Sequence, residues 1–449
     1  MRYIFTVFIC KIFIFALRIA GRRATSAPGK LALKLYPEIG RIFSSKVRKE
    51  IFAVMGTNGK TTTNNLLADY FEKEGISVVC NRIGANMTEG VTAAFIDKCS
   101  LFGKLDADYA MLESDEAWAN RIFDYYKPSK IIITNLFRDQ LDRYGEIDIT
   151  MEYIRKAIKK VPDAELILNA DDPVTVASVD DFKNKKLYFG IEKPVKEYKT
   201  KIKDGQHCYR CGKNLQYHFY HFSQIGDWFC ECGFKRPRID FNARDLKVFP
   251  KVSFTVDQIG KIELNGRGLY NTYNVLASAL LAYTEGIKNE TIISCAAKYS
   301  PQIGRMEQFN IHGKDVFLVL AKNPAGFNQS VGAVSEDPRT KDVLIAINDG
   351  AQDGRDVSWL WDVDFEEIIA GNVLTFSVSG KRYADMALRL KYAELEKERL
   401  VVSPNLKKRA EEIIKEGKGE TFYLLVNYTA LFSTRKILEE IEEKYKNGN

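Results

Sequence analysis

The chain has 449 residues, 45% of them hydrophobic and 12% aromatic, and a formal net charge of +7. This composition is typical of a globular protein with a large core and room for about three domains. The charge lies at one end, because residues 1–50 contain eleven Lys or Arg and only two acids. A basic leader favours contact with an acidic surface, either anionic lipid or a polyphosphate, whereas the lack of a recurring basic and aromatic pattern argues against nucleic acid.

The first twenty residues are apolar and aromatic, but Lys11 and Arg18 interrupt them, so the longest uncharged run is Tyr3–Cys10. A membrane-spanning helix needs about 20 apolar residues, and a secretory signal needs an unbroken apolar region followed by a cleavage site. The segment fits neither pattern. We therefore expect a basic N-terminal helical segment over residues 1–49, whose first helix either packs on the protein or lies at a membrane interface.

A strand-like run, Ile51–Met55, leads into a phosphate-binding loop and a helical pattern from Asn64 to Glu74. The residues that would hold the nucleotide are Gly56, Thr57, Asn58, Gly59, Lys60, Thr61 and Thr62. Glycines let backbone N–H groups approach the phosphates of ATP, and the helix dipole adds to their attraction. Lys60 would reach the outer phosphates and the Thr61 hydroxyl would bind Mg²⁺. Val54 replaces the first glycine of the longer consensus, and the alternative is an ordinary glycine-rich turn.

Strand patterns alternate with helical patterns after this loop, which predicts a doubly wound, mostly parallel α/β sheet. The expected strands are Ser77–Cys80, Tyr109–Glu113, Lys130–Thr134 and Ala164–Asn169, and a helix is expected over Ile149–Val161. Ligands bind at the carboxyl ends of such strands. Glu113 is therefore a candidate Mg²⁺ ligand and a candidate member of the catalytic site, with a surface acid as the alternative.

Four of the eight cysteines cluster in two turns that are each closed by glycine: Cys208, Cys211, Cys230 and Cys232. Four thiolates would fill all four coordination positions of Zn²⁺, as in structural zinc sites. A metal-binding cysteine cluster also indicates a reducing compartment, in which disulfides do not form. The second pair is a shorter Cys-x-Cys, so a histidine could replace one ligand: His207, His218 or His221. Free thiols or a redox pair are the alternative. We expect a zinc ribbon inserted at about residues 200–240.

Residues 305–449 predict a second, Rossmann-like α/β domain, which leaves residues 50–304 for the first. Its expected strands are Val316–Leu320, Val343–Asn348, Val373–Val378, Leu400–Ser403 and Phe422–Asn427. Its expected helices are Ala384–Glu394, Leu406–Glu416 and Thr434–Tyr445. A loop past the second of these strands joins three acids, Asp349, Asp353 and Asp356, to two tryptophans. This pairing favours a surface that meets a partner, although a solvated acidic loop is the alternative.

Several motifs, in this order, resemble the Mur ligases. They are Gly56-Thr-Asn-Gly-Lys-Thr, Leu112-Glu113, Thr134-Asn135 with Asp139-x-Leu-Asp, Asn169-Ala-Asp-Asp, Gly268-x-Tyr270-Asn271-x-x-Asn274 and Gly304-Arg305-x-Glu307. The resemblance implies that Asn271 lies near adenine, Arg305 on the phosphates and Glu113 on Mg²⁺. The chain departs from that family in four respects: Tyr270 replaces a His, Gln140 replaces a metal-binding His, Val319 replaces an Asp, and no carbamylated Lys can be assigned. These departures put the amino-acid-accepting chemistry in doubt.

The inserted four-cysteine ribbon and the Asp-Gly-x-Asp-Val-Ser-Trp-x-Trp-Asp loop resemble one branch of that family, the MurT synthetase subunits. That resemblance implies ATP-dependent amidation of the D-glutamate α-carboxylate of the lipid II stem peptide, through an acyl phosphate. It implies ammonia from a separate GatD-like glutaminase subunit, and a cytoplasmic place at the inner face of the membrane. The resemblance also implies that an Asp of the C-terminal domain assists the partner. Asp356 is the first choice, followed by Asp353 and Asp349.

Two other functions stay open at this stage. An ordinary Mur-type ligase would add an amino acid to a carboxylate and would need no partner. A scaffold that binds ATP and zinc without catalysis would bind nucleotide but release no ADP with substrate, and its function would survive Lys60→Ala. Glu113 and Arg305 favour an enzyme over a scaffold.

Overall fold

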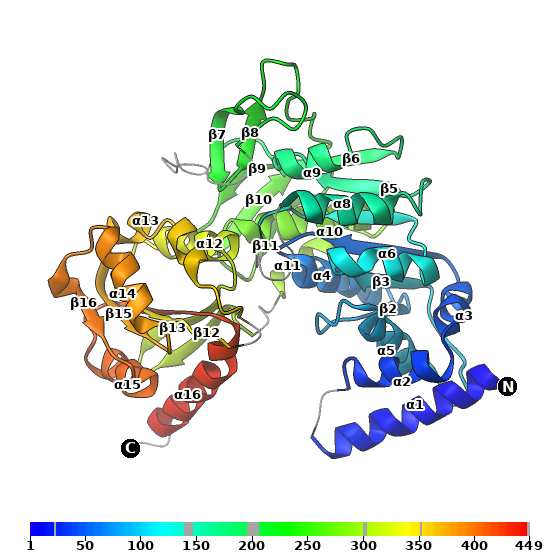
Figure 1. Ribbon diagram of the computed structural model, residues 1–449, viewed down its shortest axis with the longest axis horizontal. Coiled ribbons are helices and arrows are strands. Elements are labelled where there is room, and N and C mark those ends of the chain that lie inside the picture. The colour runs from blue at the N-terminus through cyan, green and yellow to red at the C-terminus, as the bar shows by residue number, and fades with distance from the viewer. Residues whose placement is uncertain (22–23, 139–146, 195–205, 300–302, 351–352, 447–449) are drawn as a thin grey trace.

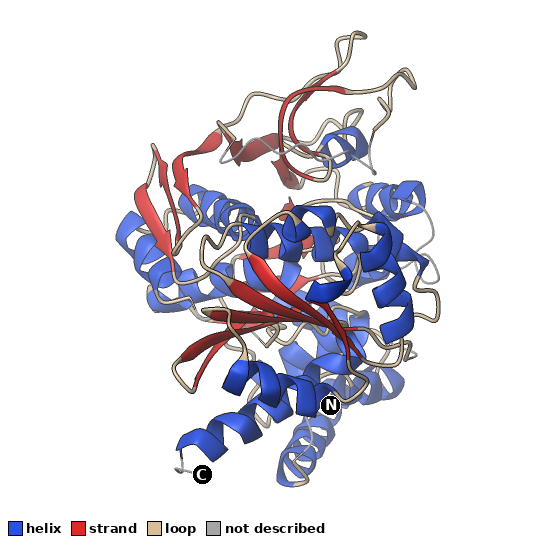
Figure 2. Ribbon diagram, turned by 90° about the vertical axis from the view of Figure 1, so that its left-hand side faces the viewer, coloured by secondary structure: helices blue, strands red, loops and turns tan. Residues whose placement is uncertain are grey.

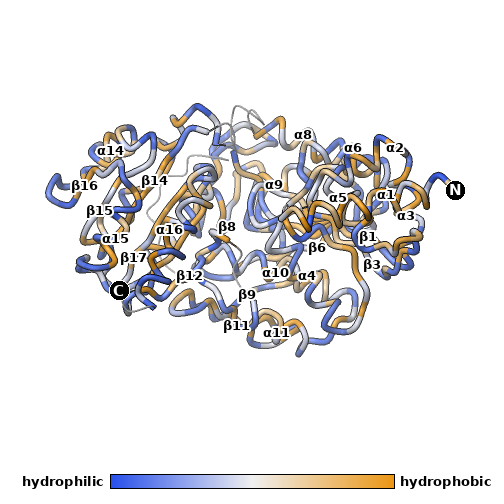
Figure 3. Tube along the Cα trace, turned by 90° about the horizontal axis from the view of Figure 1, so that it is seen from below, coloured by the Kyte–Doolittle hydropathy of each residue, from blue (hydrophilic) through white to orange (hydrophobic). Residues whose placement is uncertain are grey.

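The computed structural model describes residues 1–21, 24–138, 147–194, 206–299, 303–350 and 353–446. Two α/β domains make up this part of the chain, each with helices on both faces of a sheet, and a small hairpin projects from the first (Figure 1). Hydrophobic residues concentrate in the strands of the two sheets (Figure 3). The two α/β domains and the small insertion expected from the sequence are therefore observed.

The central sheet has nine strands in the order β11-β10-β9-β6-β5-β4-β1-β3-β2. Their bounds are β1 Glu50–Met55, β2 Val78–Cys80, β3 Tyr109–Glu113, β4 Lys130–Ile133, β5 Glu165–Asn169, β6 Lys186–Ile191, β9 Phe241–Lys247, β10 Val252–Val256 and β11 Gly260–Leu264. The strands from β2 to β9 pair in parallel, as predicted. The antiparallel strands β10 and β11, which the sequence reasoning missed, extend one edge.

Both faces of this sheet are covered because successive residues of each strand point to opposite sides. On one face, Phe52 and Val54 of β1 pack with α4 Lys60–Lys73, α10 Tyr270–Thr284 and α11 Asn289–Ala297. On the other face, Ile51 and Ala53 join a core built from more helices. These are α1 Arg2–Ile19, α2 Ala27–Leu35, α3 Ile39–Lys46, α5 Thr88–Lys98, α6 Glu116–Tyr125, α8 Ile147–Ile158 and α9 Pro173–Ser178.

The N-terminal helix α1 packs on the protein along one side only. Val7, Cys10 and Ile14 are buried and belong to the same core as the central sheet. Apolar side chains of the opposite stripe, such as Phe5 and Phe15, stay exposed. Among the described helices, none is long and apolar enough to cross a membrane.

The inserted hairpin consists of β7 Gln216–Phe222 and β8 Ile225–Phe229, and it docks on the end of the central sheet that carries the phosphate loop. The Gln224 side chain donates to the carbonyl of Leu136 (2.8 Å), and the Trp228 indole donates to the carbonyl of Ala170 (3.1 Å). The guanidinium of Arg236, just beyond the hairpin, pairs with the buried carboxylate of Asp171 at 2.7 Å. The hairpin is thus fixed to the domain on which it sits.

The C-terminal sheet, which faces the viewer in Figure 2, has the order β12-β13-β17-β14-β15-β16. The bounds are β12 Arg305–Ile311, β13 Lys314–Leu320, β14 Lys341–Ala346, β15 Val373–Ser379, β16 Leu400–Val402 and β17 Thr421–Val426. One face is covered by α12 Pro324–Ser335, the short turn η1 Ser358–Asp362, α13 Glu366–Ile369 and α14 Tyr383–Tyr392. The other face is covered by α15 Leu406–Glu416 and α16 Tyr428–Lys446. A second short turn, η2 Lys397–Arg399, precedes β16.

This domain confirms the five expected strands and adds β12, α12 and the short elements η1, α13 and η2, which were not expected. The run Arg305–Ile311 alternates polar and apolar residues, contains a β-bulge and pairs antiparallel with β13 at the sheet edge, so it lacks the continuous apolar signal of a buried strand. The last helix also begins at Tyr428 rather than Thr434.

Candidate active site

The phosphate loop lies at the carboxyl end of β1, between β3 and β4. The Thr57 amide donates to the carbonyl of Asn135 (2.8 Å), and the Asn58 amide donates to the Asn135 side chain (2.9 Å). Gly56 and Gly59 have φ angles of +123° and +86°, and a Cβ on either would come within 2.2 Å of a neighbouring side-chain oxygen. The glycines therefore let the backbone turn against its neighbours, so that the N–H groups at the start of α4 are free to face an anion.

Lys60 is the first residue of α4 and lies almost buried beside Glu116, with 3.1 Å between its Nζ and Glu116 Oε1. The same carboxylate oxygen accepts the Gly56 amide at 2.7 Å, and Lys60 also donates to the Gly56 carbonyl. Burial works to lower the pKa of Lys60, but the carboxylates of Glu116, Glu113 and Asp115 outweigh it and raise the pKa. The lysine is therefore a cation, held in place before any phosphate arrives.

Sequence reasoning did not assign a role to Glu116, which stands 56 residues after Lys60 in the chain. Its signal was its position three residues past Glu113, at the start of α6, where Asp115 caps the helix by accepting the Ala117 amide. The carboxylate thus lies at the same sheet edge as the phosphate loop.

Glu113 ends β3, directly beside Val54 of β1, and only 2% of its surface is exposed. Its Oε1 accepts the Asn86 amide at 3.2 Å, while its buried Oε2 has no hydrogen-bond partner in the described chain. A Cβ placed on Gly84 would stand 3.4 Å from the Thr61 hydroxyl and 3.8 Å from both Glu113 oxygens, so these oxygens converge on one small space. Burial raises the pKa of the Glu113 carboxyl. An unpartnered carboxylate oxygen beside a hydroxyl is a fitting donor set for Mg²⁺.

A pocket lies where the phosphate loop, the inserted hairpin and the C-terminal domain meet. Asn58, Gly59 and Thr62 line it from the loop, and Arg305 lines it from the start of β12. The remaining wall is made by Asn135 and Asn169 at strand ends, Phe222 and Ile225 of the hairpin, Tyr270, Tyr273 and Asn274 of α10, and Gln329 of α12. Arg305 is thus brought together with the loop. Asn271 does not line this pocket: its side-chain Nδ2 donates to the carbonyl of Arg267 (2.7 Å), and its Oδ1 accepts from the Asn274 amide (3.2 Å).

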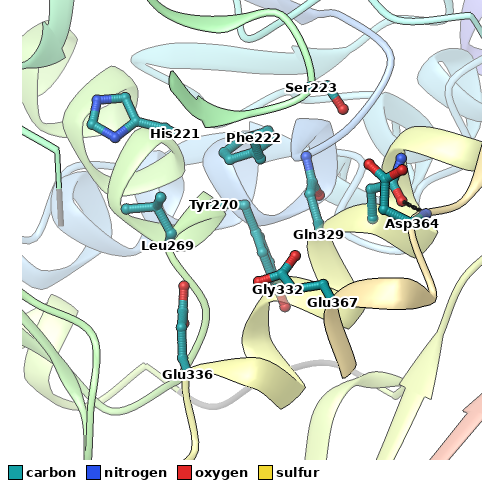
Figure 4. A pocket seen from close by; sticks show the side chains of 11 residues that line it. His221, Phe222, Ser223, Leu269, Tyr270, Gln329, Gly332, Glu336, Asp364 and Glu367 are labelled. Atoms are coloured by element: carbon teal, nitrogen blue, oxygen red, sulfur yellow. Dashed lines mark hydrogen bonds between the residues drawn. The ribbon is translucent and has the colours of Figure 1, made fainter. Parts of the chain in front are cut away.

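A second pocket continues from the first and shares Phe222, Tyr270 and Gln329 with it (Figure 4). Phe222 and Tyr270 lie on either side of the space that runs from the hairpin to α12, with Leu269 and Glu336 farther along the wall. The hairpin's part in this wall was missed because nothing in a local sequence pattern predicts which strand end an insertion will cover. Gln140, with the rest of 139–146, lies outside the described residues.

His221 lies at the edge of this second pocket, fully buried, with no hydrogen-bond partner at either ring nitrogen within the described chain. Burial and the nearby Arg236 guanidinium lower the pKa of His221 from 6.5 to about 3. Its imidazole therefore stays neutral in the folded protein at neutral pH. The group of described residues that could hold a metal ion consists of the four cysteines alone, and it includes none of His207, His218 and His221.

We expect the buried His221 to make folding stability depend on pH. Because the unfolded state binds a proton near pH 6.5 and the folded state only near 3, stability is fully present above pH 6.5 and falls as the pH falls. The loss should be about 2 kcal/mol by about pH 5. Urea unfolding of the wild type and of His221→Leu across this range measures it. The variant should show a flatter dependence, and an equal slope in both proteins would contradict the assignment.

The four cysteines lie at the base of the hairpin, with every pair of sulfur atoms within 4.8 Å. Cys208 and Cys232 are 3.6 Å apart, and Cys211 and Cys230 are 3.5 Å apart. Four sulfurs at ~2.3 Å from a tetrahedral Zn²⁺ would be separated by about 3.8 Å, so the spacing fits the ion. Cys208 and Cys230 are buried against Trp228 and Phe234, which ties the cluster to the hairpin core.

The three acids of the C-terminal loop have different surroundings. Asp353 is buried and accepts hydrogen bonds from the Thr429 amide (3.0 Å) and hydroxyl. Asp356 is exposed, accepts the amide and hydroxyl of Ser358 at 2.8 and 2.9 Å, and has its pKa lowered by these bonds. The Asp349 side chain is 30% exposed and lies within 4.0 Å of the cations of Lys381 and Arg382. Two acids are thus accessible, and the third fixes the loop to α16.

Two family models match the chain: the Mur ligase middle domain over residues 54–282 and the MurT ligase C-terminal domain over residues 320–431. Lipid II isoglutaminyl synthase (glutamine-hydrolyzing) subunit MurT from Staphylococcus aureus strain COL is 34% identical over 449 residues, 100% of both chains. The protein of the same name from Streptococcus pneumoniae strain R6 is 35% identical over 93% of this chain and 92% of its own.

Two solved structures share the fold. A pseudomurein peptide ligase type C from Methanothermus fervidus superposes with a TM-score of 0.70 at 22% identity, covering 89% of this chain and 80% of its own. A MurF ligase from Thermotoga maritima in complex with ADP gives 0.64 at 16% identity, covering 93% and 85%. Both similarities concern the fold alone.

Proposed function

Because this chain belongs to the MurT family, a branch of the Mur ligases, we propose that it is the synthetase subunit of a lipid II isoglutaminyl synthase. It amidates the α-carboxylate of D-glutamate in the lipid II stem peptide and consumes ATP. The observation that carries the proposal is the meeting of the phosphate loop, Glu113 and Arg305 at one sheet edge in a chain that matches MurT over its whole length.

The site residues divide the work of phosphoryl transfer. The substrate carboxylate attacks the γ-phosphorus of ATP, and the N–H groups of the loop, Lys60 and Arg305 stabilise the negative charge on the transferring group. Thr61 and Glu113 would hold Mg²⁺, which supplies further charge neutralisation when bound. Ammonia then attacks the acyl carbon and displaces phosphate, so that the amide, ADP and phosphate leave.

The part of the pocket wall formed by Phe222 and Tyr270 would receive the base of the nucleotide. Phe222 and Tyr270 offer aromatic faces, and Asn271 stands beside Tyr270 at the start of α10. Cys208, Cys211, Cys230 and Cys232 would hold a structural Zn²⁺ that keeps the hairpin, and hence Phe222, in place.

Ammonia comes from a glutaminase subunit that binds the C-terminal domain. The acid loop and the exposed aromatic pair Tyr428 and Phe432 adjoin each other, because Thr429 of the same helix holds Asp353 of the loop. Exposed aromatic residues are enriched at protein interfaces. Asp356, or Asp349 as its alternative, would orient a histidine of the partner.

We expect Asp356→Asn, or failing that Asp349→Asn, to abolish the use of glutamine while sparing the use of ammonium. Loss of a carboxylate that orients a catalytic histidine costs on the order of 10²–10⁴-fold. The measurement compares glutamine-dependent and ammonium-dependent amidation by the two-subunit complex. Glu398→Gln, on an exposed acid of the turn η2 in the same domain, is the matched control. If both variants use glutamine at the wild-type rate, neither carboxylate assists the catalytic histidine of the glutaminase.

The proposed function is tested with the purified chain, MgATP and detergent-solubilised lipid II, supplied with either ammonium chloride or glutamine. Amidated lipid II with ammonium, and with glutamine only after the glutaminase is added, is the expected result. A mass gain equal to an amino acid would identify an ordinary Mur-type ligase instead. ATP binding without ADP release, with or without the partner, would identify a scaffold.

A further inference from the structure

Helix α1 is apolar on two opposite sides, and only one of them is used by the fold. Val7, Cys10 and Ile14 face the core, at the spacing of one helix stripe. The other stripe carries large side chains that are 41–72% exposed: Ile4, Phe5, Phe8, Ile12, Phe15 and Ile19. A surface helix normally turns charged or polar residues to solvent on this side. The exposed stripe therefore has no role in holding this chain together.

A second exposed apolar segment, the loop that follows α5, lies beside the first turn of α1. The Tyr3 hydroxyl donates to the carbonyl of Gly103 at 2.8 Å, which brings this loop against the first turn of α1. Leu101 and Phe102 of the loop are 50% and 75% exposed. Two exposed apolar segments thus lie at the same end of the first domain, and exposed apolar side chains that gather in this way mark interaction sites rather than ordinary solvent-facing surface.

Positive charge surrounds this surface. Helix α1 contains Arg2, Lys11 and Arg18 and no acid, and the flanking segments add the exposed Lys98 and Lys104. The acid that faces α1 is Asp97, which pairs with Arg18 at 2.9 Å. Residues 1–50 as a whole contain eleven cations against two acids. An apolar stripe flanked by Lys and Arg is complementary to a bilayer that carries anionic lipid.

We propose that the outer stripe of α1, with Leu101 and Phe102, docks the protein on the surface of an anionic lipid membrane. The helix lies in the plane of the interface, with its apolar side chains among the acyl chains and its cations at the headgroups. It occupies the outer edge of the first domain in Figure 1 and lies on the side seen in Figure 3. This inference rests on the proposed function, because the proposed substrate, lipid II, resides in a bilayer. Its test does not depend on catalysis.

The test measures binding of the wild-type chain, in complex with its glutaminase, to vesicles of phosphatidylcholine alone or mixed with phosphatidylglycerol. Flotation should recover the protein with the mixed vesicles, and less of it at high salt. Phe8→Glu/Phe15→Glu should weaken this binding at least about tenfold, because two aromatic side chains that would insert among the acyl chains are replaced by charges. The uncharged pair Phe5→Ser/Phe15→Ser should weaken it as well, which guards against a folding defect in the first variant.

Leu388→Glu is the matched control, since Leu388 is 47% exposed on helix α14 of the other domain and should leave vesicle binding unchanged. Amidation of detergent-solubilised lipid II should be equal in all variants, and its absence in the wild type would refute the proposed function and not the docking surface. Failure of the wild type to float with either vesicle would overturn the docking proposal. So would a dimer that Phe8→Glu/Phe15→Glu converts to a monomer, because a second copy would then cover the stripe.

Discussion

Lys60→Ala is expected to lower the rate of amidation by about 10²–10³-fold, the usual cost of removing one preorganised donor from a developing negative charge. The side chain is only 11% exposed and is already held by Glu116 and by the Gly56 carbonyl, so its position requires little reorganisation when phosphate arrives. The measurement is the steady-state rate with ammonium as the nitrogen source, which removes the glutaminase from the comparison. ATP affinity should fall less than the rate.

Lys73→Ala is the matched control, because Lys73 ends the same helix and is exposed. Removing Lys60 leaves the Glu116 carboxylate without its cation, so thermal unfolding of the variant must show that it folds. Lys60→Gln, which keeps a donor near Glu116, provides a second folded protein. A folded variant of either kind that amidates within threefold of the wild type would remove Lys60 from the phosphoryl-transfer step.

Cys211→Ser is expected to remove zinc and, with it, at least about tenfold of the affinity for ATP. A structural zinc contributes about 10–16 kcal/mol to the domain that it holds, whereas each hydrogen bond that docks the hairpin contributes only about 1 kcal/mol. Without the ion the hairpin should therefore loosen. Phe222 and Ile225, which line the pocket beside the phosphate loop, would then lose their fixed positions. Metal analysis and calorimetric titration with ATP measure the two effects.

Cys295→Ser on α11 is the control for this experiment, because Cys295 is partly exposed and does not belong to the four-cysteine group. It should retain zinc and nucleotide affinity. Unchanged ATP affinity in a Cys211→Ser protein that has lost its zinc would separate the ribbon from the nucleotide site. Full zinc content in that variant would show that the ion is held by other groups.

The phosphate loop was predictable because its chemistry is local. Glycine, lysine and threonine at fixed spacing after an apolar run specify a strand, a turn and a helix start, and the structure has all three. The position of Glu113 was predictable for a related reason, since a carboxylate at the end of a parallel strand lies at the edge of the sheet where ligands bind. The helix begins at Lys60 rather than Asn64, because the polar residues of its first turn hide the apolar periodicity.

The rest of the site could not be predicted because it is assembled from distant parts of the chain. Glu116 reaches Lys60 across neighbouring strands, and Phe222 reaches the pocket from an insertion whose docking depends on Gln224 and Trp228. The pocket also needs Gln329 of α12, a helix whose small and polar residues gave no clear pattern. Such contacts depend on how the domains pack, which periodicity along a sequence does not encode.

The burial of Val7, Cys10 and Ile14 in the core of the central sheet has a practical consequence for anyone preparing this protein. The first twenty residues resemble a hydrophobic leader that could be deleted to improve solubility. Deleting them would uncover the apolar side chains of α2 and α5 that now pack against α1. The shortened protein would therefore exchange one exposed hydrophobic surface for another. Replacing exposed side chains such as Phe5 and Phe15 with serine reduces the exposed hydrophobic surface and leaves the core intact.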